Sequence, residues 1–511
     1  MSDKMNEDVM QAEKRQAWWI LGMNTFAFTV CFAAWMLNGV LITFFVDNGI
    51  HSWGPSEMGW LIGIPVLTGA IFRLPLGIAT DKYGGRIVFG LLLLFSAIPM
   101  FLVSYCNSYW EFFAAGLGFG FAGTGFAIGI AYTSVWFPKH QQGTALGIFG
   151  AGNAGAALTS LGAPQVLNWL TDNGQNLEGW RHLPKIYAAM LVITGVLYLL
   201  TTTKRLPPGS ATKTLLERLQ PLKSMRVWRF GLYYFFVFGG FVALAQWLVP
   251  YYVNAYATTV ALAGALAACN SLPSGVIRAA GGWMSDVFGA RTVMYWVLGT
   301  SLACCVLLIV PQMDIRSRGS GVMAKAAGRI VGVTEGEIVV EAKTGQQRMY
   351  ELKLKEGVLV TAEEREKGLL VLPRSMSWQE SVVDVGQEVK KKELLARGVT
   401  QIFFQANIWV FTVLSLILGA VMGIGMAAVY KHIPDYFPAD VGVVGGIVGV
   451  LGGLGGFICP VIFGYLLKST GLWTSCWMFL AILVTVCLAW MHIVIQRMLR
   501  AKAPDLAHQI E

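Results

Sequence analysis

Long apolar runs separated by short polar stretches follow one another from residue 18 to residue 496. Each run is close to the length of about 20 residues that an α-helix needs to cross the apolar core of a bilayer. Two longer polar stretches, 204–229 and 317–400, interrupt the series. The pattern predicts twelve transmembrane helices, near residues 18–46, 57–80, 87–105, 109–136, 144–168, 186–203, 230–256, 258–284, 292–311, 402–432, 442–467 and 472–496.

Composition and charge agree with a polytopic membrane protein. The 511 residues are 55% hydrophobic and 13% charged, a balance that a soluble multidomain protein would not show. The net charge of +9 would suggest a nucleic-acid partner in a soluble chain, but its distribution indicates membrane topology instead. The stretch 204–229 carries Lys204, Arg205, Lys213, Arg218, Lys223, Arg226 and Arg229. The alternate loops at 47–56, 105–111 and 255–258 carry no Lys or Arg, so both termini and 204–229 are predicted to be cytoplasmic.

One motif occurs twice, which indicates a duplicated protein. Its members are Arg73, Gly77, Asp81, Gly84 and Arg86, then Arg278, Gly282, Asp286, Gly289 and Arg291, each shifted by 205 residues. The two leading arginines are isolated charges inside apolar runs, about 12 Å along a helix from the polar loop and therefore near the middle of the bilayer. Such a charge needs an anionic partner. The carboxylates of the candidate spans lie near span ends, so the expected partner is the cargo.

A second repeated segment locates an insertion. Trp136-Phe137-Pro138 returns as Tyr436-Phe437-Pro438. Phe137 follows Arg86 by 51 positions, but Phe437 follows Arg291 by 146, so 95 extra residues separate the ninth and tenth spans. Alternation such as that of 336–341 predicts a small β domain. The expected domains are 1–203 and 230–316 with 401–511 as two pseudo-symmetric six-helix halves, 204–229 as a cytoplasmic loop, and 317–400 as an external β-rich insertion.

The end of this insertion, residues 383–396, resembles the β-hairpin turns of biotinyl/lipoyl-like domains. It departs from them at Lys392, where glycine is usual, and no suitably flanked lysine marks a modification site. A structural or docking module is therefore favoured over a carrier, and its partner is unknown. The cysteines lack metal-ligand spacing, so no metal or cofactor is expected.

The segment Gly77–Arg86 resembles the signature loop of the major facilitator superfamily. The resemblance implies two six-helix halves around a central site, with alternating access to its two sides. The charged loops have two open interpretations, gating through ion pairs or anchoring of the topology. Glycines in the fifth and eleventh spans would allow helices to approach closely. These packing glycines are Gly150, Gly152, Gly155, Gly449, Gly452, Gly453 and Gly455.

Asn153 stands among these glycines, and an amide in hydrocarbon must find hydrogen bonds. The segments Gly150–Gly155 and Gly449–Phe457, with the two membrane arginines, resemble the nitrate/nitrite porters of NarK/NasA type across the chain outside the insertion. The resemblance implies that Arg73 and Arg278 bind the anion and that Tyr234, Phe238 and Phe126 complete the pocket. It also implies a bacterial inner-membrane location, with nitrate, nitrite or both as cargo.

Planar, permanently charged guanidinium groups suit a flat oxyanion. Because the six histidines lie near span ends or in loops, anion exchange fits the residues better than proton symport, but the coupling stays open. A carrier of another small anion, such as an organic carboxylate or phosphate, is the first alternative. A membrane sensor that reads a ligand through the insertion is the second. No nucleophile–base pair points to an enzyme.

Overall fold

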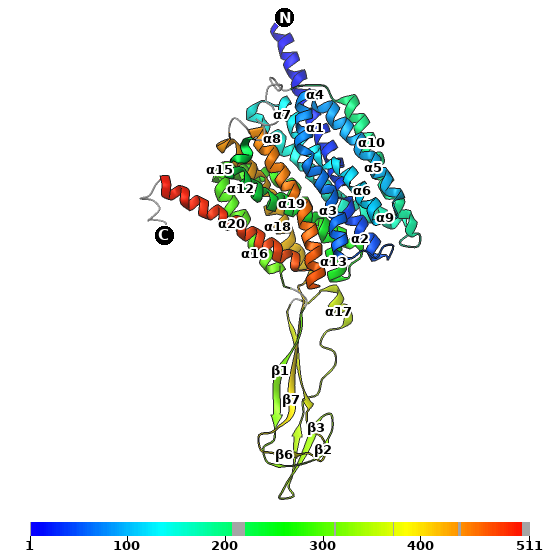
Figure 1. The fold of residues 1–511 in the computed structure, drawn as a ribbon, viewed down its shortest axis with the longest axis vertical. Helices are drawn as coiled ribbons and strands as arrows, with labels where there is room; N and C mark the ends of the chain where they lie inside the picture. Colours follow the sequence, from blue (N-terminus) through cyan, green and yellow to red (C-terminus); the bar gives the residue numbers. More distant parts are fainter. Residues whose placement is uncertain (1, 207–219, 311–312, 371, 438–440, 503–511) are drawn as a thin grey trace. The chain divides into compact units, whose positions relative to one another are not determined.

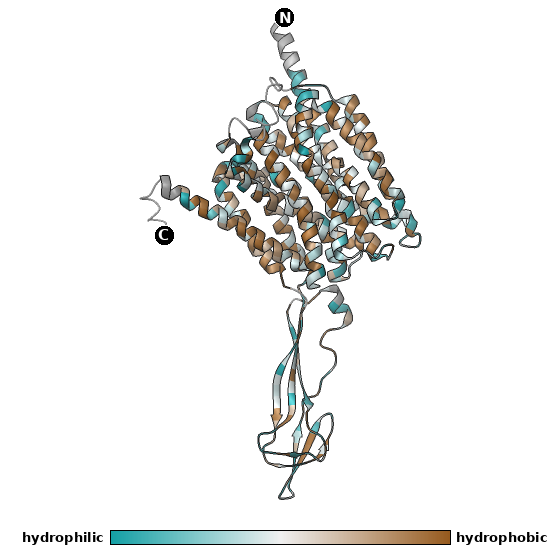
Figure 2. Cartoon of the chain, viewed as in Figure 1, coloured by the Kyte–Doolittle hydropathy of each residue, from teal (hydrophilic) through white to brown (hydrophobic). Residues whose placement is uncertain are grey.

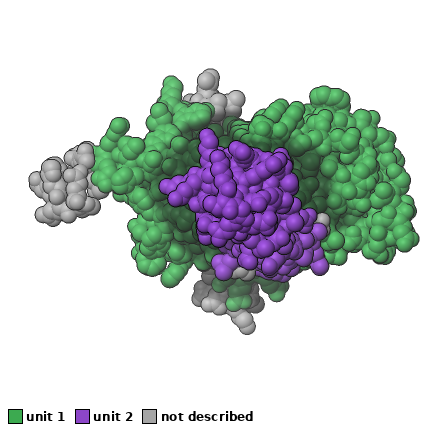
Figure 3. All heavy atoms as spheres, turned by 90° about the horizontal axis from the view of Figure 1, so that it is seen from below, with its two compact units in different colours: residues 1–309, 412–511 green, residues 310–411 purple. Residues whose placement is uncertain are grey.

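The computed structural model describes residues 2–206, 220–310, 313–370, 372–437 and 441–502. Lys213, Arg218 and Pro438, which the sequence analysis used, lie outside these ranges. The chain divides into two compact units, coloured separately in Figure 3. Residues 1–309 and 412–511 form the helical unit, and residues 310–411 form the β unit.

The helical unit contains long helices that run side by side (Figure 1). Those of the first half are α1 (Ser2–Trp35), α2 (Leu37–Asp47), α3 (Pro55–Ile71), α4 (Arg73–Tyr83), α5 (Gly85–Leu102), α6 (Tyr109–Phe119), α7 (Gly125–Trp136), α8 (Lys139–Gly150), α9 (Gly155–Leu170) and α10 (His182–Thr201). Those of the second half are α12 (Met225–Tyr234), α13 (Phe241–Tyr256), α14 (Val260–Val276), α15 (Arg278–Phe288), α16 (Ala290–Leu308), α18 (Ile408–Tyr436), α19 (Val441–Thr470) and α20 (Ser475–Lys502). Hydrophobic residues dominate them (Figure 2).

Among the described residues, ten helical stretches are long and apolar enough to cross a membrane. A further pair, Val260–Val276 and Ala280–Phe288, is bent by 52° and counts as an eleventh span. The span predicted near 144–168 is helical too, as α8, a 3₁₀ turn η3 (Ala151–Ala154) and α9, but it does not belong to these ten or eleven. Its glycines, glutamines and asparagines make it less apolar than the others. The predicted all-α membrane fold with a β-rich insertion is confirmed.

Each membrane arginine begins a new helix after a one-residue break. Phe72 separates α3 from α4, and Ile277 separates α14 from α15. Pro75, in the first turn of α4, lacks the N–H that would continue the helix across Phe72. The duplication therefore places both arginines directly after a break in the helix, and the helices on either side of Arg278 are bent by 52°.

Three other long helices of the unit change winding within their length. The 3₁₀ turn η2 (Gly120–Thr124) joins α6 to α7, and η3 joins α8 to α9. A π-helical segment, η6 (Phe235–Gly240), joins α12 to α13. Irregular turns of this kind inside long helices are frequent at functional sites.

The two halves touch closely at the end of the helices that carries the loop 48–54. A Cβ added at Gly59 of α3 would lie 2.4 Å from the Pro460 carbonyl oxygen of α19. A Cβ at Gly264 of α14 would lie 2.0 Å from the Ser160 carbonyl oxygen of α9. Toward the other end of α19, a Cβ at Gly446 would meet no described atom within 4 Å. Backbone contact between the halves thus extends from this end to the neighbourhood of Arg278, where a Cβ at Gly275 would lie 2.9 Å from the Ala154 backbone nitrogen.

The β unit contains two antiparallel sheets. Its strands are β1 (Met313–Met323), β2 (Gly328–Val333), β3 (Glu337–Ala342), β4 (Gln347–Glu351), β5 (Arg374–Ser381), β6 (Glu388–Val389) and β7 (Leu394–Phe404). One sheet has the order β1-β7-β5, and the other has the order β4-β3-β2-β6. The strands therefore begin and end a few residues outside the predicted insertion 317–400.

The β unit has a core and fixed turns of its own. Ile330, Ile338 and Leu395 are buried together in its main apolar cluster. Lys392 adopts the left-handed conformation (φ 71°), at the position where the resembling hairpins use glycine. A short helix, α17 (Ala362–Lys367), is held at its start by Glu364, whose pKa is lowered by the Thr361 backbone N–H and by Arg374.

We predict that the helical unit folds without the insertion. Arg316 of β1 and Gln401 of β7 are directly paired partners, so an Asn-Gly linker in place of residues 317–400 closes a two-residue hairpin. Shortening a loop changes its closure free energy by only about 0.6 kcal/mol per halving. The apparent melting temperature in detergent should therefore stay close to that of the full chain. Deletion of residues 260–288 is the control that should abolish folding, and an unfolded 317–400 replacement would contradict the prediction.

Candidate functional site

Arg73 lies buried at the start of α4 and faces aromatic rings and one carbonyl group. Its side chain is 3% exposed. Its Nη1 donates a 2.6 Å hydrogen bond to the Gly449 carbonyl oxygen of α19. Its Cζ lies 5.0 Å from the ring centre of Phe238 and 5.4 Å from that of Phe126. Its Nε has no hydrogen-bond acceptor among the described residues.

Arg278 occupies the corresponding place at the start of α15. It is 9% exposed, and its Cζ lies 5.2 Å from the ring centre of Phe126 and 5.8 Å from that of Tyr430. A Cβ added at Gly150 would lie 3.2 Å from the Arg278 Cδ, so that glycine gives the arginine its room. The Arg278 Nη1 is buried without an acceptor in the described part of the chain.

Both guanidinium groups therefore contact the ring of Phe126. Two guanidinium groups repel each other, and each loses hydration when it is buried. Cation–π contacts offset only a part of this, at about 2 kcal/mol when desolvated. No ion pair of the described residues involves Arg73 or Arg278. The site thus has excess positive charge and unused N–H donors, which an anion would satisfy.

Stacked rings form the remaining wall. Tyr234 and Phe238 stack at 5.1 Å with an interplanar angle of 3°, across the junction of α12 and the π-helical η6. Phe238 also stacks on Phe126 at 6.2 Å, and Tyr234 meets Tyr430 edge-on at 5.0 Å. The hydroxyl of Tyr430 donates to the Gly445 carbonyl oxygen at 3.0 Å. The hydroxyl of Tyr234 is buried without a partner among the described residues.

Asn153 lies in η3, one turn after Gly150. It is fully buried, and neither amide atom has a hydrogen-bond partner in the described chain. Residues three apart share a face in this tight winding, so Asn153 lies on the same face as Gly150, which abuts Arg278. The structure gives no direct contact between Asn153 and either arginine.

The duplicated loop motif differs between the halves. Gly84 and Gly289 have φ values of 90° and 82°, which explains the glycine at the loop. Arg86 donates two hydrogen bonds, of 3.0 and 2.6 Å, to the Leu199 carbonyl oxygen of α10. Arg291 donates to the Tyr436 hydroxyl at 3.1 Å.

Asp286 pairs with Lys431 of α18, within its own half of the protein. Both side chains are about half exposed, and surface pairs of this kind contribute about 0–1 kcal/mol. Asp81 lies near the end of α4, and neither Gly77 nor Gly282 brings described atoms within 4 Å of an added Cβ. Gating and anchoring both stay predictions for this motif.

The predicted packing glycines fall into two groups. Gly152, Gly155, Gly452 and Gly455 abut side chains or backbone of their own half, such as the Phe28 ring beside Gly152 and the Tyr234 ring beside Gly452. Gly150, Gly449 and Gly453 lie beside the arginines. A Cβ at Gly453 would lie 2.7 Å from the Ala70 Cβ and 3.5 Å from the Arg73 Nη1. The second group shapes the charged pocket.

Three groups of the pocket were absent from the sequence prediction. These are Tyr430, Trp35, whose ring centre lies 5.9 Å from the Arg73 Cζ, and the Gly449 carbonyl oxygen. For the two rings, the only available signal in the sequence was an aromatic residue inside a candidate span. A backbone carbonyl group gives no signal in the sequence, because every residue has one. Among the described residues, no group of three or more His, Cys, Asp and Glu side chains could hold a metal ion.

The family model of the Major Facilitator Superfamily matches residues 24–336 and 394–508. The fold is also similar to a bacterial homolog of the human lysosomal transporter Spinster in an inward-facing, occupied conformation, with a TM-score of 0.62 at 12% identity. That comparison covers 94% of this chain and 96% of the other. Fold and family together define a membrane transporter of the Major Facilitator Superfamily.

Sequence relatives identify the family within this superfamily. The chain is 36% identical to the probable nitrate/nitrite antiporter NarK1 of Thermus thermophilus, over 96% of this chain and 95% of the relative. It is 31% identical to the probable nitrate/nitrite transporter NarK2 of Mycobacterium tuberculosis, over 58% of this chain and 74% of the relative. A nitrite extrusion protein of Bacillus subtilis is 27% identical over 60% of this chain and 75% of its own length. The chain belongs to the nitrate/nitrite porter family.

We predict that Gly453→Ala disturbs the pocket and that Gly446→Ala does not. The added methyl at 453 meets Ala70 and Arg73, whereas at 446 it meets open space. Alanine is favoured over glycine inside a helix by about 1 kcal/mol, so Gly446→Ala should keep or raise the melting temperature in detergent. Gly453→Ala should lower it, because overpacking costs about 1–3 kcal/mol. Equal melting temperatures for the two variants would contradict this account of α19.

Proposed function

We propose that this protein carries nitrate and nitrite across a bacterial inner membrane by alternating access. The observation that supports this most directly is the pair of buried guanidinium groups at one phenyl ring, without a carboxylate partner among the described residues. The names of the nitrate and nitrite transporters among the relatives support the same cargo.

A planar anion fits the chemistry of the pocket. The Arg73 Nε and Arg278 Nη1 are unused donors, and a flat oxyanion offers them acceptors in one plane. The rings of Phe126, Phe238 and Tyr430 leave little hydrogen-bonding capacity for a larger polar cargo. These features support nitrate or nitrite over an organic carboxylate or phosphate.

The packing of the halves supports an arrangement open toward one side. Glycine contacts close the end that carries the loop 48–54, while Gly446 at the opposite end of α19 meets no described atom. With the basic loop placed in the cytoplasm by the positive-inside rule, the closed end is external and both termini are cytoplasmic. The site would then face the cytoplasm in this conformation.

We further propose exchange of anions as the coupling. The empty site carries two positive charges in a low-dielectric region, and one bound anion reduces this to a single charge. Reorientation of the empty carrier would therefore be slower than that of the loaded carrier. In the described residues no ion pair brings a carboxylate to the arginines, so a proton has no obvious acceptor beside the bound anion.

Substitution of each arginine by lysine tests the site. Lysine keeps the charge but lacks the planar fork, so Arg73→Lys and Arg278→Lys should each weaken nitrate affinity by about tenfold or more. The assay is uptake of labelled nitrate into proteoliposomes with matched amounts of protein. The control is Arg205→Lys, an exposed arginine on the ring of Trp136, which should transport normally. Wild-type affinity in both membrane-arginine variants would refute the site.

Asn153→Ala tests the neighbouring amide. If Asn153 donates to the bound anion, its loss should weaken nitrate affinity or change the ratio of nitrate to nitrite transport while the melting temperature changes little. A bond between helices would instead contribute about 0.6 kcal/mol of stability and leave the cargo preference alone. Both quantities are measurable on one preparation. Lower stability with unchanged preference would remove Asn153 from the site.

A further inference from the structure

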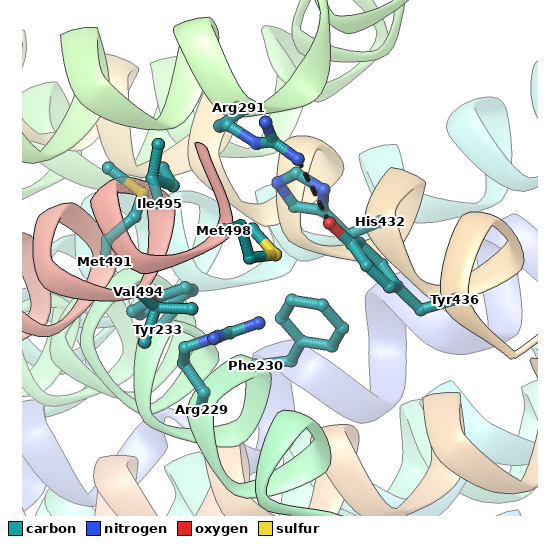
Figure 4. A pocket seen from close by; sticks show the side chains of 10 residues that line it. All are labelled: Arg229, Phe230, Tyr233, Arg291, His432, Tyr436, Met491, Val494, Ile495 and Met498. Carbon is teal, nitrogen blue, oxygen red and sulfur yellow. Dashed lines mark hydrogen bonds between the residues drawn. The ribbon is translucent and has the colours of Figure 1, made fainter. Parts of the chain in front are cut away.

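A second cluster of basic side chains lies away from the transport pocket, in a cleft among α12, α16, α18 and α20 (Figure 4). Arg229 and Tyr233 enter it from α12, and Arg291 enters it from α16. His432 and Tyr436 of α18 complete its polar side. None of the described residues that line the cleft is acidic.

Arg229 is the unusual member. It is only 9% exposed, and it has no hydrogen bond or ion pair within the described residues. Its one ring contact is with Phe230, 5.6 Å from the Cζ. A buried guanidinium without an acceptor is costly unless a ligand supplies one. Figure 4 shows its nitrogen atoms directed into the cleft.

Two further donors face the same space. The hydroxyl of Tyr233 is buried and has no partner in the described chain. Arg291 is exposed, and only its Nη2 is engaged, by the Tyr436 hydroxyl at 3.1 Å (Figure 4). The ring of Phe230 stacks on that of His432 with 5.5 Å between the ring centres, and both rings line the cleft. The cleft thus presents several donors and a positive field.

The surroundings indicate the edge of the membrane. Arg229 lies one turn into α12, whose first turn exposes Met225 (69%) and Trp228 (46%). Exposed tryptophan at the start of a membrane helix is typical of the bilayer interface. The opposite wall of the cleft is apolar and belongs to α20, with Met491, Val494, Ile495 and Met498. A polar ligand with an acyl chain suits a cleft that has one basic and one apolar wall.

We propose that this cleft binds a phosphate group, carried by the headgroup of an anionic phospholipid. Basic pockets between membrane helices are known to take such headgroups. The cleft is open on one side and has a volume of about 20 Å³, room for one water-sized group, so one phosphate oxygen enters beside Arg229 and Tyr233. The remaining oxygens stay outside, within reach of Arg291. The lipid would brace α12 against α16 and α20 in the second half.

The test is native mass spectrometry of the purified full-length protein, titrated with phosphatidylglycerol or, separately, with phosphatidylcholine. Arg229→Gln and Arg291→Gln should each weaken retention of phosphatidylglycerol by about tenfold. Arg205→Gln, which removes one exposed charge beside Trp136, should retain it within about twofold of the wild type. Because Arg291 is exposed, its variant decides the matter even if Arg229→Gln fails to fold.

A second arm separates the two sources of phosphate. Inorganic phosphate is added to delipidated protein in detergent, and the melting temperature is measured. A rise that depends on Arg229 and Arg291, without retention of phosphatidylglycerol, supports the phosphate site with a free anion as its ligand. The proposal is overturned if both variants bind lipid and phosphate as the wild type does, or if Arg205→Gln loses as much as they do. Neither readout depends on nitrate transport.

Discussion

The repulsion between two buried guanidinium groups, held at the single ring of Phe126, is the constraint on which the helical unit depends. Arg73 donates one hydrogen bond to a backbone carbonyl group, and Arg278 lies beside Gly150. Neither contact supplies a negative charge, so both positive charges remain. Replacing the charges with apolar residues would remove this cost of desolvation and repulsion. The presence of both buried charges suits a site that binds and releases its counter-ion.

The backbone is irregular at most points where it reaches this site, although α18 with Tyr430 and α19 with Gly449 pass the site as unbroken helices. The arginines follow helix breaks, Phe126 follows η2, Asn153 lies in η3, and Tyr234 and Phe238 flank or lie in a π-helical segment. A regular helix keeps its carbonyl and N–H groups paired, whereas bends and changes of winding re-aim side chains into the centre. The glycines beside the arginines then let helices approach to the distance at which these groups meet.

The helical fold and most residues of the pocket could be predicted from the amino-acid sequence, because both depend on patterns that repeat along the chain. Apolar runs located the spans, and the shift of 205 residues paired Arg73 with Arg278. Tyr430 and the Gly449 carbonyl escaped prediction, since an isolated tyrosine near a span end has no spacing signal and a carbonyl has no side chain to identify it. The partners of Asp286 and Arg291 depend on how helices of one half pack, which periodicity does not specify.

Counterflow in proteoliposomes tests the central claim that the bound anion lowers the charge of the arginine pair from two to one and lets the carrier reorient. Labelled nitrate is supplied outside, with the membrane potential and pH gradient collapsed, to vesicles that contain unlabelled nitrite or an impermeant buffer. We predict rapid uptake only into the vesicles that contain nitrite. Uptake into buffer-filled vesicles that an imposed pH gradient accelerates, and that internal nitrite does not, would contradict the claim.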